Sequence, residues 1–131
     1  MATATAMDTK GFKAAVRNQW DASARSWNDH TPRIRAWLRS GTDAMLDMAG
    51  VRLGARVLDV AAGAGDQTLD IAERAGPQGR VLATDLSPAI LELAQANATR
   101  GACGTSKRAW QTANSSTSTR PRSTRPSAGW V

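Results

Sequence analysis

Two aspartates and two glycines stand at spacings that could hold a positively charged ligand. Asp59 belongs to a short apolar run, Gly63 and Gly65 follow directly after that run, and Asp85 comes 20 residues after Gly65, at the end of a second apolar run. Carboxylates attract cations, and glycine lets the backbone turn tightly and lie against a ligand. The pattern predicts a binding loop over residues 59–65 for a ligand that carries positive charge.

Glycine-rich loops also bind phosphates, but this loop lacks the chemistry for it. Residues 58–70 contain three Asp and no Lys or Arg, whereas a pyrophosphate site favours positive charge. A G-x-G-x-x-G fingerprint started at Gly63 has Thr68 in place of its third glycine, and one started at Ala61 has Asp66 there. The Gly-Lys-Ser/Thr of a Walker loop is also absent. Nicotinamide, flavin and P-loop nucleotide sites are therefore excluded.

The segments around the loop predict the elements that position it. Residues 56–60 and 80–84 are short apolar runs, typical of buried parallel strands. Residues 66–75 predict a helix closed by Gly76-Pro77, and residues 87–98 predict another helix. Strand, helix, strand and helix make one βαβα unit with a right-handed crossover. The expected fold class is α/β, with this unit spanning residues 56–100.

The N-terminal part of the chain is expected to be helical over residues 11–55, after a disordered start at residues 1–10. Thr31 and Pro32 suit the N-cap and first turn of a helix, and Gly41 argues against one unbroken helix. Apolar side chains recur at steps of three, four and seven and predict a core-facing stripe. The stripe consists of Ile34, Trp37, Leu38, Met45 and Met48.

The C-terminal residues 101–131 are predicted to be a disordered basic tail. They are rich in Ser, Thr, Arg and Pro and show neither a helical nor a strand period. They carry five Lys or Arg and no acid, whereas residues 1–100 carry twelve Lys or Arg and eleven Asp or Glu. Clustered arginines can bind nucleic acid, but only Trp110 and Trp130 could stack on bases there, so nucleic acid is not an expected partner.

The cysteine content and the hydropathy of the sequence indicate the cellular compartment of the protein. Cys103 is the only cysteine, which excludes an internal disulfide and a cysteine-based zinc site, and no metal is expected. The sequence lacks the apolar stretch of a secretory signal and any run long enough to span a membrane. The expectation is a soluble, cytoplasmic protein without a membrane span.

The acids, the glycines and their strand context together resemble the class I S-adenosylmethionine-dependent methyltransferases. Residues 57–94 are most similar to the ubiquinone/menaquinone-biosynthesis C-methyltransferase-like group, which commonly has an Ala-rich loop followed by Gly-Asp. The resemblance covers residues 12–100 and implies the N-terminal part of a Rossmann-like doubly wound fold. It also implies S-adenosylmethionine as cofactor and a small-molecule methyl acceptor. A small α/β ligand-binding module without catalysis, or a basic-tailed nucleic-acid binder, stays open as an alternative.

The resemblance also implies roles for individual residues. Asp59 would face the methionyl ammonium, directly or through water. Asp85 would accept hydrogen bonds from the ribose hydroxyls, and Leu86 would pack near the adenine. Most of the superfamily has glycine at position 61, so a methyl group is tolerable there only with φ below zero. The complete set of expected cofactor-binding residues is Asp59, Ala61, Gly63, Gly65, Asp85 and Leu86.

Other residues of the N-terminal region have weaker claims to a role. Related methyltransferases use N-terminal helices as part of a lid, so Trp20 and Trp27 could cover the cofactor, whereas Trp37 is expected in the core. His30, the single histidine, is expected at the surface or in a cap rather than as a catalytic base. No catalytic residue is predicted, because acceptor-binding residues normally follow the fourth strand of this fold.

The sequence after Arg100 departs from the family pattern, which continues with a third and a fourth strand. Back-translation with permitted codons, and one restored nucleotide after Arg100, yields a text that resembles this missing continuation. We therefore hypothesise that the reading frame shifts after Arg100. The chain would then carry only the cofactor-binding half of a methyltransferase and be inactive alone.

Overall fold

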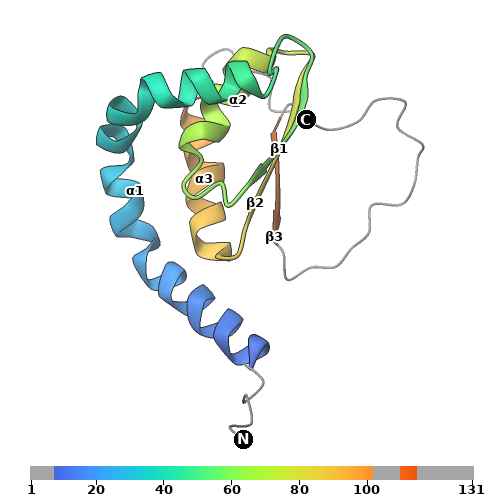
Figure 1. The fold of residues 1–131 in the computed structure, drawn as a ribbon. Coiled ribbons are helices and arrows are strands. Elements are labelled where there is room, and N and C mark those ends of the chain that lie inside the picture. The colour runs from blue at the N-terminus through green and yellow to red at the C-terminus, as the bar shows by residue number, and fades with distance from the viewer. Residues whose placement is uncertain (1–7, 102–109, 115–131) are drawn as a thin grey trace, which may run out of the picture.

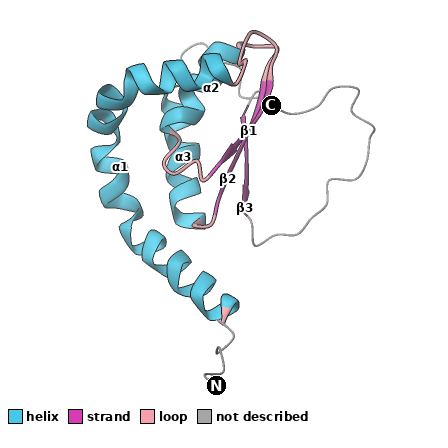
Figure 2. Cartoon of the chain, in the orientation of Figure 1, coloured by secondary structure: helices cyan, strands magenta, loops and turns pink. Residues whose placement is uncertain are grey.

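Three parallel strands and three helices make up the part of the chain that the computed structural model describes, residues 8–101 and 110–114. Their order is α1 (Thr9–Met48), β1 (Arg56–Val60), α2 (Asp66–Ala75), β2 (Arg80–Asp85), α3 (Pro88–Gly101) and β3 (Trp110–Asn114). The strand order is β1-β2-β3. The helices lie together on one side of the sheet (Figures 1 and 2).

The short apolar runs form the strands because their side chains alternate between a covered and an open face. Val57 and Val81 lie opposite each other in the register and are both buried, and Ile71 of α2 packs on them. Leu46 at the end of α1 joins this cluster. The predicted βαβα unit is therefore confirmed.

The N-terminal region forms one helix of 40 residues that continues through both Pro32 and Gly41. The helix start expected at Thr31 and Pro32 and the interruption expected at Gly41 are therefore wrong. Asp8 is the N-cap, and its Oδ1 accepts a hydrogen bond from the Gly11 N–H at 3.1 Å. Thr31 is not a cap, since its hydroxyl donates to the Trp27 carbonyl oxygen at 3.2 Å within the helix. The beginning and end of α1 run in different directions (Figure 1), as expected for a helix that continues through a proline. Tertiary contacts outweigh the local cost of this proline.

The apolar stripe predicted for α1 does not face the core. Trp37 is 81% exposed and Met48 is 90% exposed, whereas Ala24, Thr42 and Leu46 are the buried residues of this helix. The reason is that α1 turns a charged face toward α2, where its Arg and Asp side chains form ion pairs across the helix contact. The prediction of a core position for Trp37 is wrong.

The predicted disorder is wrong at both ends of the described chain. Thr9 and Lys10 begin α1 after the N-cap Asp8, and Trp110–Asn114 form β3, which pairs in parallel with β2. Pairing with a neighbouring strand supplies backbone hydrogen bonds, which a strand can form without an alternating pattern of apolar side chains in its sequence. The rest of the predicted disordered start and tail lies outside the described residues. Within the described part, no helix is both long enough and apolar enough to cross a membrane.

Candidate functional site

A cavity of about 340 Å³ opens where the first two strands end, between the sheet and α1. Its floor is the loop 61–63, and its walls come from α1, from the start of α2 and from the end of β2. The carboxyl ends of parallel strands are where open α/β sheets bind ligands. The cavity therefore occupies the position that the sequence predicted for the site.

Asp85 connects the end of β2 to this loop. Its Oδ2 accepts a hydrogen bond from the Gly63 N–H at 3.1 Å, and its Oδ1 accepts one from the Ser87 N–H at 2.9 Å. Asp85 and the following Leu86 both line the cavity. Backbone donors hold this carboxylate in place, so a ligand meets an acceptor whose position is set in advance.

The loop needs positive φ at three positions, but for different reasons. Ala61 has a φ of 60°, so the expectation that its φ lies below zero is wrong. Gly63 has a φ of 56°, and a Cβ added there would lie 3.5 Å from the Trp27 Nε1, across the cavity. Gly65 has a φ of 88°, and an added Cβ would lie 3.2 Å from the Ala94 Cβ of α3. Gly65 thus permits helix packing and does not line the cavity.

Asp59 sits behind the loop rather than in the cavity. The Thr68 hydroxyl donates to its Oδ2 at 2.5 Å, which ties β1 to α2. Burial raises the pKa of Asp59; the Thr68 hydrogen bond lowers it, and the charge of Asp85 raises it further. Among the six residues predicted to bind the cofactor, those that line the cavity are Ala61, Gly63, Asp85 and Leu86.

The aromatic side chains of α1 divide into two groups. Trp20 and Trp27 line the cavity and meet edge to face, with ring centroids 5.7 Å apart and planes at 89°. They stand where a cover for a bound ligand was expected. Trp37 is absent from this lining, and so is His30, which is exposed with its Nδ1 2.7 Å from the Ser26 carbonyl oxygen.

Three charged residues of the cavity wall were not predicted as site residues: Arg35, Asp66 and Asp70. The two aspartates were counted only among the acids that favour a positively charged ligand. The Asp70 side chain is 4% exposed and is held by Arg35, whose Nε donates to its Oδ2 at 3.3 Å and whose Nη2 contacts its Oδ1. Asp66 is the first residue of α2. The available signal was the charged stripe at four-residue steps, Arg35, Arg39, Asp43 and Asp47, on one face of α1.

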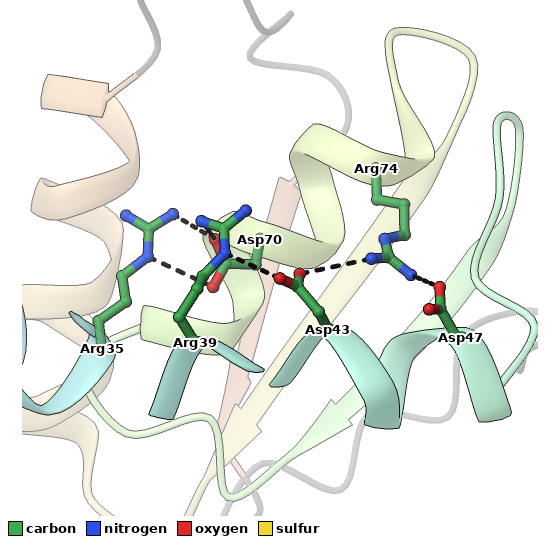
Figure 3. A network of polar contacts seen from close by, with 6 residues as sticks. All are labelled: Arg35, Arg39, Asp43, Asp47, Asp70 and Arg74. Carbon is green, nitrogen blue, oxygen red and sulfur yellow. Dashed lines mark hydrogen bonds and ion pairs between the residues drawn. The ribbon is translucent and has the colours of Figure 1, made fainter. Parts of the chain in front are cut away.

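This stripe forms a chain of ion pairs with α2 (Figure 3). The Arg39 Nη1 lies 3.5 Å from the Asp70 Oδ1, and the Arg39 Nε lies 3.1 Å from the Asp43 Oδ2. Arg74 of α2 then bridges Asp43, at 3.4 Å, and Asp47. These ion pairs hold α1 against α2, because Asp70 and Arg74 of α2 each pair with two residues of α1.

The sequence of the chain was compared with models of known protein families. The model of the ubiE/COQ5 methyltransferase family matches residues 32–121, more than half of the chain. The chain belongs to this family. The match includes the cavity loop, Asp85 and the strand β3.

Curated relatives of the family match a shorter segment. The chain is 42% identical over 48 residues to the ubiquinone/menaquinone biosynthesis C-methyltransferase UbiE of Hahella chejuensis, covering 37% of this chain and 19% of the relative. It is 37% identical over 59 residues to the UbiE of Pseudomonas fluorescens, covering 45% of this chain and 22% of the relative. The chain thus spans about a fifth of the length of the curated relatives that it matches.

Solved methyltransferase structures share the fold. The magnesium protoporphyrin IX methyltransferase of Synechocystis PCC 6803 with bound SAM superposes with a TM-score of 0.55 at 14% identity, over 86% of this chain and 57% of that one. A SAM-dependent methyltransferase of Aquifex aeolicus superposes with a TM-score of 0.50 at 23% identity, over 56% of this chain and 37% of that one. These likenesses establish a partial Rossmann-like fold.

The family match continues past Arg100 and includes β3. Residues 110–114 form a third strand beside β2, so the expectation that the third strand is missing after Arg100 is wrong. The hypothesis of a shifted reading frame after Arg100 stays a prediction, and the nucleotide sequence across that codon tests it.

Proposed function

We propose that this chain binds S-adenosylmethionine and forms the cofactor-binding part of an enzyme that methylates a small molecule. The observation that carries the proposal is the cavity at the strand ends, with the Asp85 carboxylate held in its wall by two backbone N–H groups. Family membership supports it. A cytoplasmic location is part of the proposal and agrees with the single cysteine of the chain.

The proposed reaction is an in-line displacement at the methyl carbon. A lone pair or carbanion of the acceptor forms the new bond to the methyl group. The carbon–sulfur bond breaks, and its electron pair stays on sulfur, which leaves S-adenosylhomocysteine. An acceptor that starts out protonated releases that proton to water. The positively charged sulfur of the sulfonium is already a good leaving group. The main contribution expected of the protein is therefore to hold the sulfonium in position.

We assign the adenosine part of the cofactor to the β2 end of the cavity. Asp85 would accept hydrogen bonds from the ribose hydroxyls, and Leu86 would pack against the adenine. The backbone at Ala61 and Gly63 would lie along the cofactor. Trp20 and Trp27 would cover it from α1, because both side chains border the same cavity.

The methyl acceptor is assigned only as a small molecule. The chain spans about a fifth of the length of the curated relatives that it matches. We propose that the acceptor site depends on parts of the fold that follow the first three strands. The chain by itself would then bind the cofactor weakly and transfer no methyl group.

The proposal is tested by titrating the chain with S-adenosylhomocysteine. Binding is measured from changes in the backbone amide chemical shifts, which detect weak binding. We expect saturable shifts in residues 61–66 and 85–87 of the unchanged chain. Replacing Asp85 with Ala should weaken binding about tenfold or more, because hydrogen bonds to a charged group are lost. Glu92→Gln, on the exposed face of α3, is the matched control and should bind as the unchanged chain does. Absence of any saturable shift in the unchanged chain would overturn the proposed function.

A further inference from the structure

We propose that Arg35 and Asp66 grip the amino-acid end of S-adenosylmethionine, Arg35 at the carboxylate and Asp66 at the ammonium. This inference rests on the proposed function. It assigns the ammonium to a different aspartate from the one that the sequence suggested.

Asp66 presents an unsatisfied acceptor to the cavity. It lines the cavity at the start of α2, and its Oδ1 is buried without a hydrogen-bond partner among the described residues. A buried carboxylate oxygen without a donor is costly, and the ammonium of a ligand would remove that cost. Burial raises the pKa of Asp66, against smaller opposing effects of the Thr31 hydroxyl and the Arg35 charge.

Asp70 fixes the orientation of the Arg35 guanidinium, which keeps further N–H donors for a ligand. Its Nε and Nη2 are used by Asp70, a buried residue that also belongs to the cavity wall. In Figure 3 the remaining guanidinium nitrogen points away from Asp70, and no contact is drawn to it. A guanidinium fixed on one edge can donate from its other edge to a carboxylate.

The two residues form a pair of opposite charges near each other. The Asp70 hydrogen bond raises the pKa of Arg35 most, and the charge of Asp66 raises it further. Burial raises the pKa of Asp66, and the charge of Arg35 lowers it. An α-amino acid group carries its ammonium and carboxylate on one carbon, so it matches such a pair. Arg35 and Asp66 belong to the α1 and α2 walls, whereas Asp85 belongs to the β2 end of the cavity. The cofactor would therefore lie along the loop, with its adenosine at one end and its amino acid at the other.

Asp59 is a poor competitor for the ammonium on geometric grounds. Its carboxylate accepts the Thr68 hydroxyl hydrogen bond and is not part of the cavity lining. The sequence alone could not separate the two aspartates, because both flank the glycines of one loop. Their different surroundings in the fold separate them.

The experiment compares three ligands that differ only at the amino-acid end. S-Adenosylhomocysteine has both charges, its decarboxylated analogue keeps the ammonium alone, and 5′-methylthioadenosine has neither. Dissociation constants are measured by amide chemical shifts for the full chain and for Asp66→Asn, Asp59→Asn, Arg35→Lys and the control Glu92→Gln. The ligand without either charge also reports whether each variant still folds and binds adenosine.

We expect Asp66→Asn to weaken S-adenosylhomocysteine and its decarboxylated analogue about tenfold or more and to leave 5′-methylthioadenosine unchanged. Arg35→Lys keeps a charge beside Asp70 but loses the second donor edge, so it should weaken S-adenosylhomocysteine and spare the decarboxylated analogue.

Three results would overturn the assignment. The first is an Asp66→Asn variant that binds all three ligands like the unchanged chain, and the second is a loss confined to Asp59→Asn. The third is an equal loss for all three ligands in Asp66→Asn, which would make Asp66 a structural residue. If the unchanged chain binds no adenosyl ligand at all, the proposed function fails, and this inference fails with it.

Discussion

Ala61 is the only described residue other than glycine with a positive φ, 60°. The left-handed region costs an L-residue about 1–2 kcal/mol, and glycine enters it at little steric cost. Relief of this strain in Ala61→Gly should raise the free energy of unfolding, and the larger chain entropy that glycine loses on folding should offset part of the gain. We expect a net increase of up to about 1 kcal/mol. Urea denaturation measures this change.

The neighbouring Ala62 is the matched control for this substitution, because its φ is not positive. Ala62→Gly gains no relief and should lower stability by roughly 0.5–1 kcal/mol. Equal effects of the two substitutions would contradict the strain assigned to Ala61.

Asp59 makes stability depend on pH. Burial raises its pKa in the folded state above the ordinary value, so at pH values between the unfolded-state and folded-state pKa the folded chain keeps a proton that the unfolded chain releases. The sign follows from linkage: the contribution of Asp59 to stability falls as pH rises from the unfolded-state pKa to the folded-state pKa. Asp59→Asn keeps an acceptor for the Thr68 hydroxyl and removes the charge. We expect this variant to be more stable at neutral pH and to lose this part of the pH dependence.

Thermal melts from pH 3 to pH 8 measure the difference between the two proteins. The gap in melting temperature should widen as pH rises. A gap that narrows with rising pH would show that the ionised Asp59 stabilises the fold.

At the scale of the helices, two of the ion pairs between α1 and α2 share one buried acid, Asp70. The Asp70 side chain is 4% exposed, accepts hydrogen bonds from Arg35 and forms an ion pair with Arg39 at 3.5 Å. We expect Asp70→Ala to lower the free energy of unfolding by about 1–3 kcal/mol, since it leaves Arg35 without its partner. Arg39→Gln should cost less than Asp70→Ala, because Arg39 is mostly solvent-exposed and water screens its ion pairs. Chemical denaturation of both variants tests the order, and a larger loss in Arg39→Gln would contradict it.

At the scale of the whole molecule, one face of the sheet lacks a helix layer in the described part of the chain. Val60 is 70% exposed and Leu58 is 44% exposed, whereas Val57 between the sheet and the helices is buried. Parallel sheets normally have both faces covered, and the outer edge of β1 pairs with no described strand. We expect the chain to self-associate through this surface.

Sedimentation at increasing protein concentration tests this expectation with a charge placed on the bare face. Val60→Lys should shift the chain toward monomer. Gln78→Lys adds the same charge in the exposed turn after α2 and should change association little. Monomeric behaviour of the unchanged chain at all concentrations would contradict the argument.

The sequence by itself determined the elements that carry the site. Residues 56–60 and 66–75 have the bounds of β1 and α2, because short apolar runs and glycine stops act locally on the backbone. The loop and Asp85 were likewise predictable from their position at strand ends. These features depend on neighbours in the chain, which a sequence displays directly.

The tertiary structure decided which side chains meet in the cavity. Asp59 and Asp66 both flank the same glycines, yet only Asp66 lines the cavity, because Thr68 binds Asp59 behind the loop. Trp37 lies exposed although it belongs to an apolar stripe, since the ion pair between Arg35 and Asp70 sets how α1 is turned. The partners in both cases come from different elements. Contacts of this kind have no period along the chain, so only the folded arrangement of α1 on α2 specifies them.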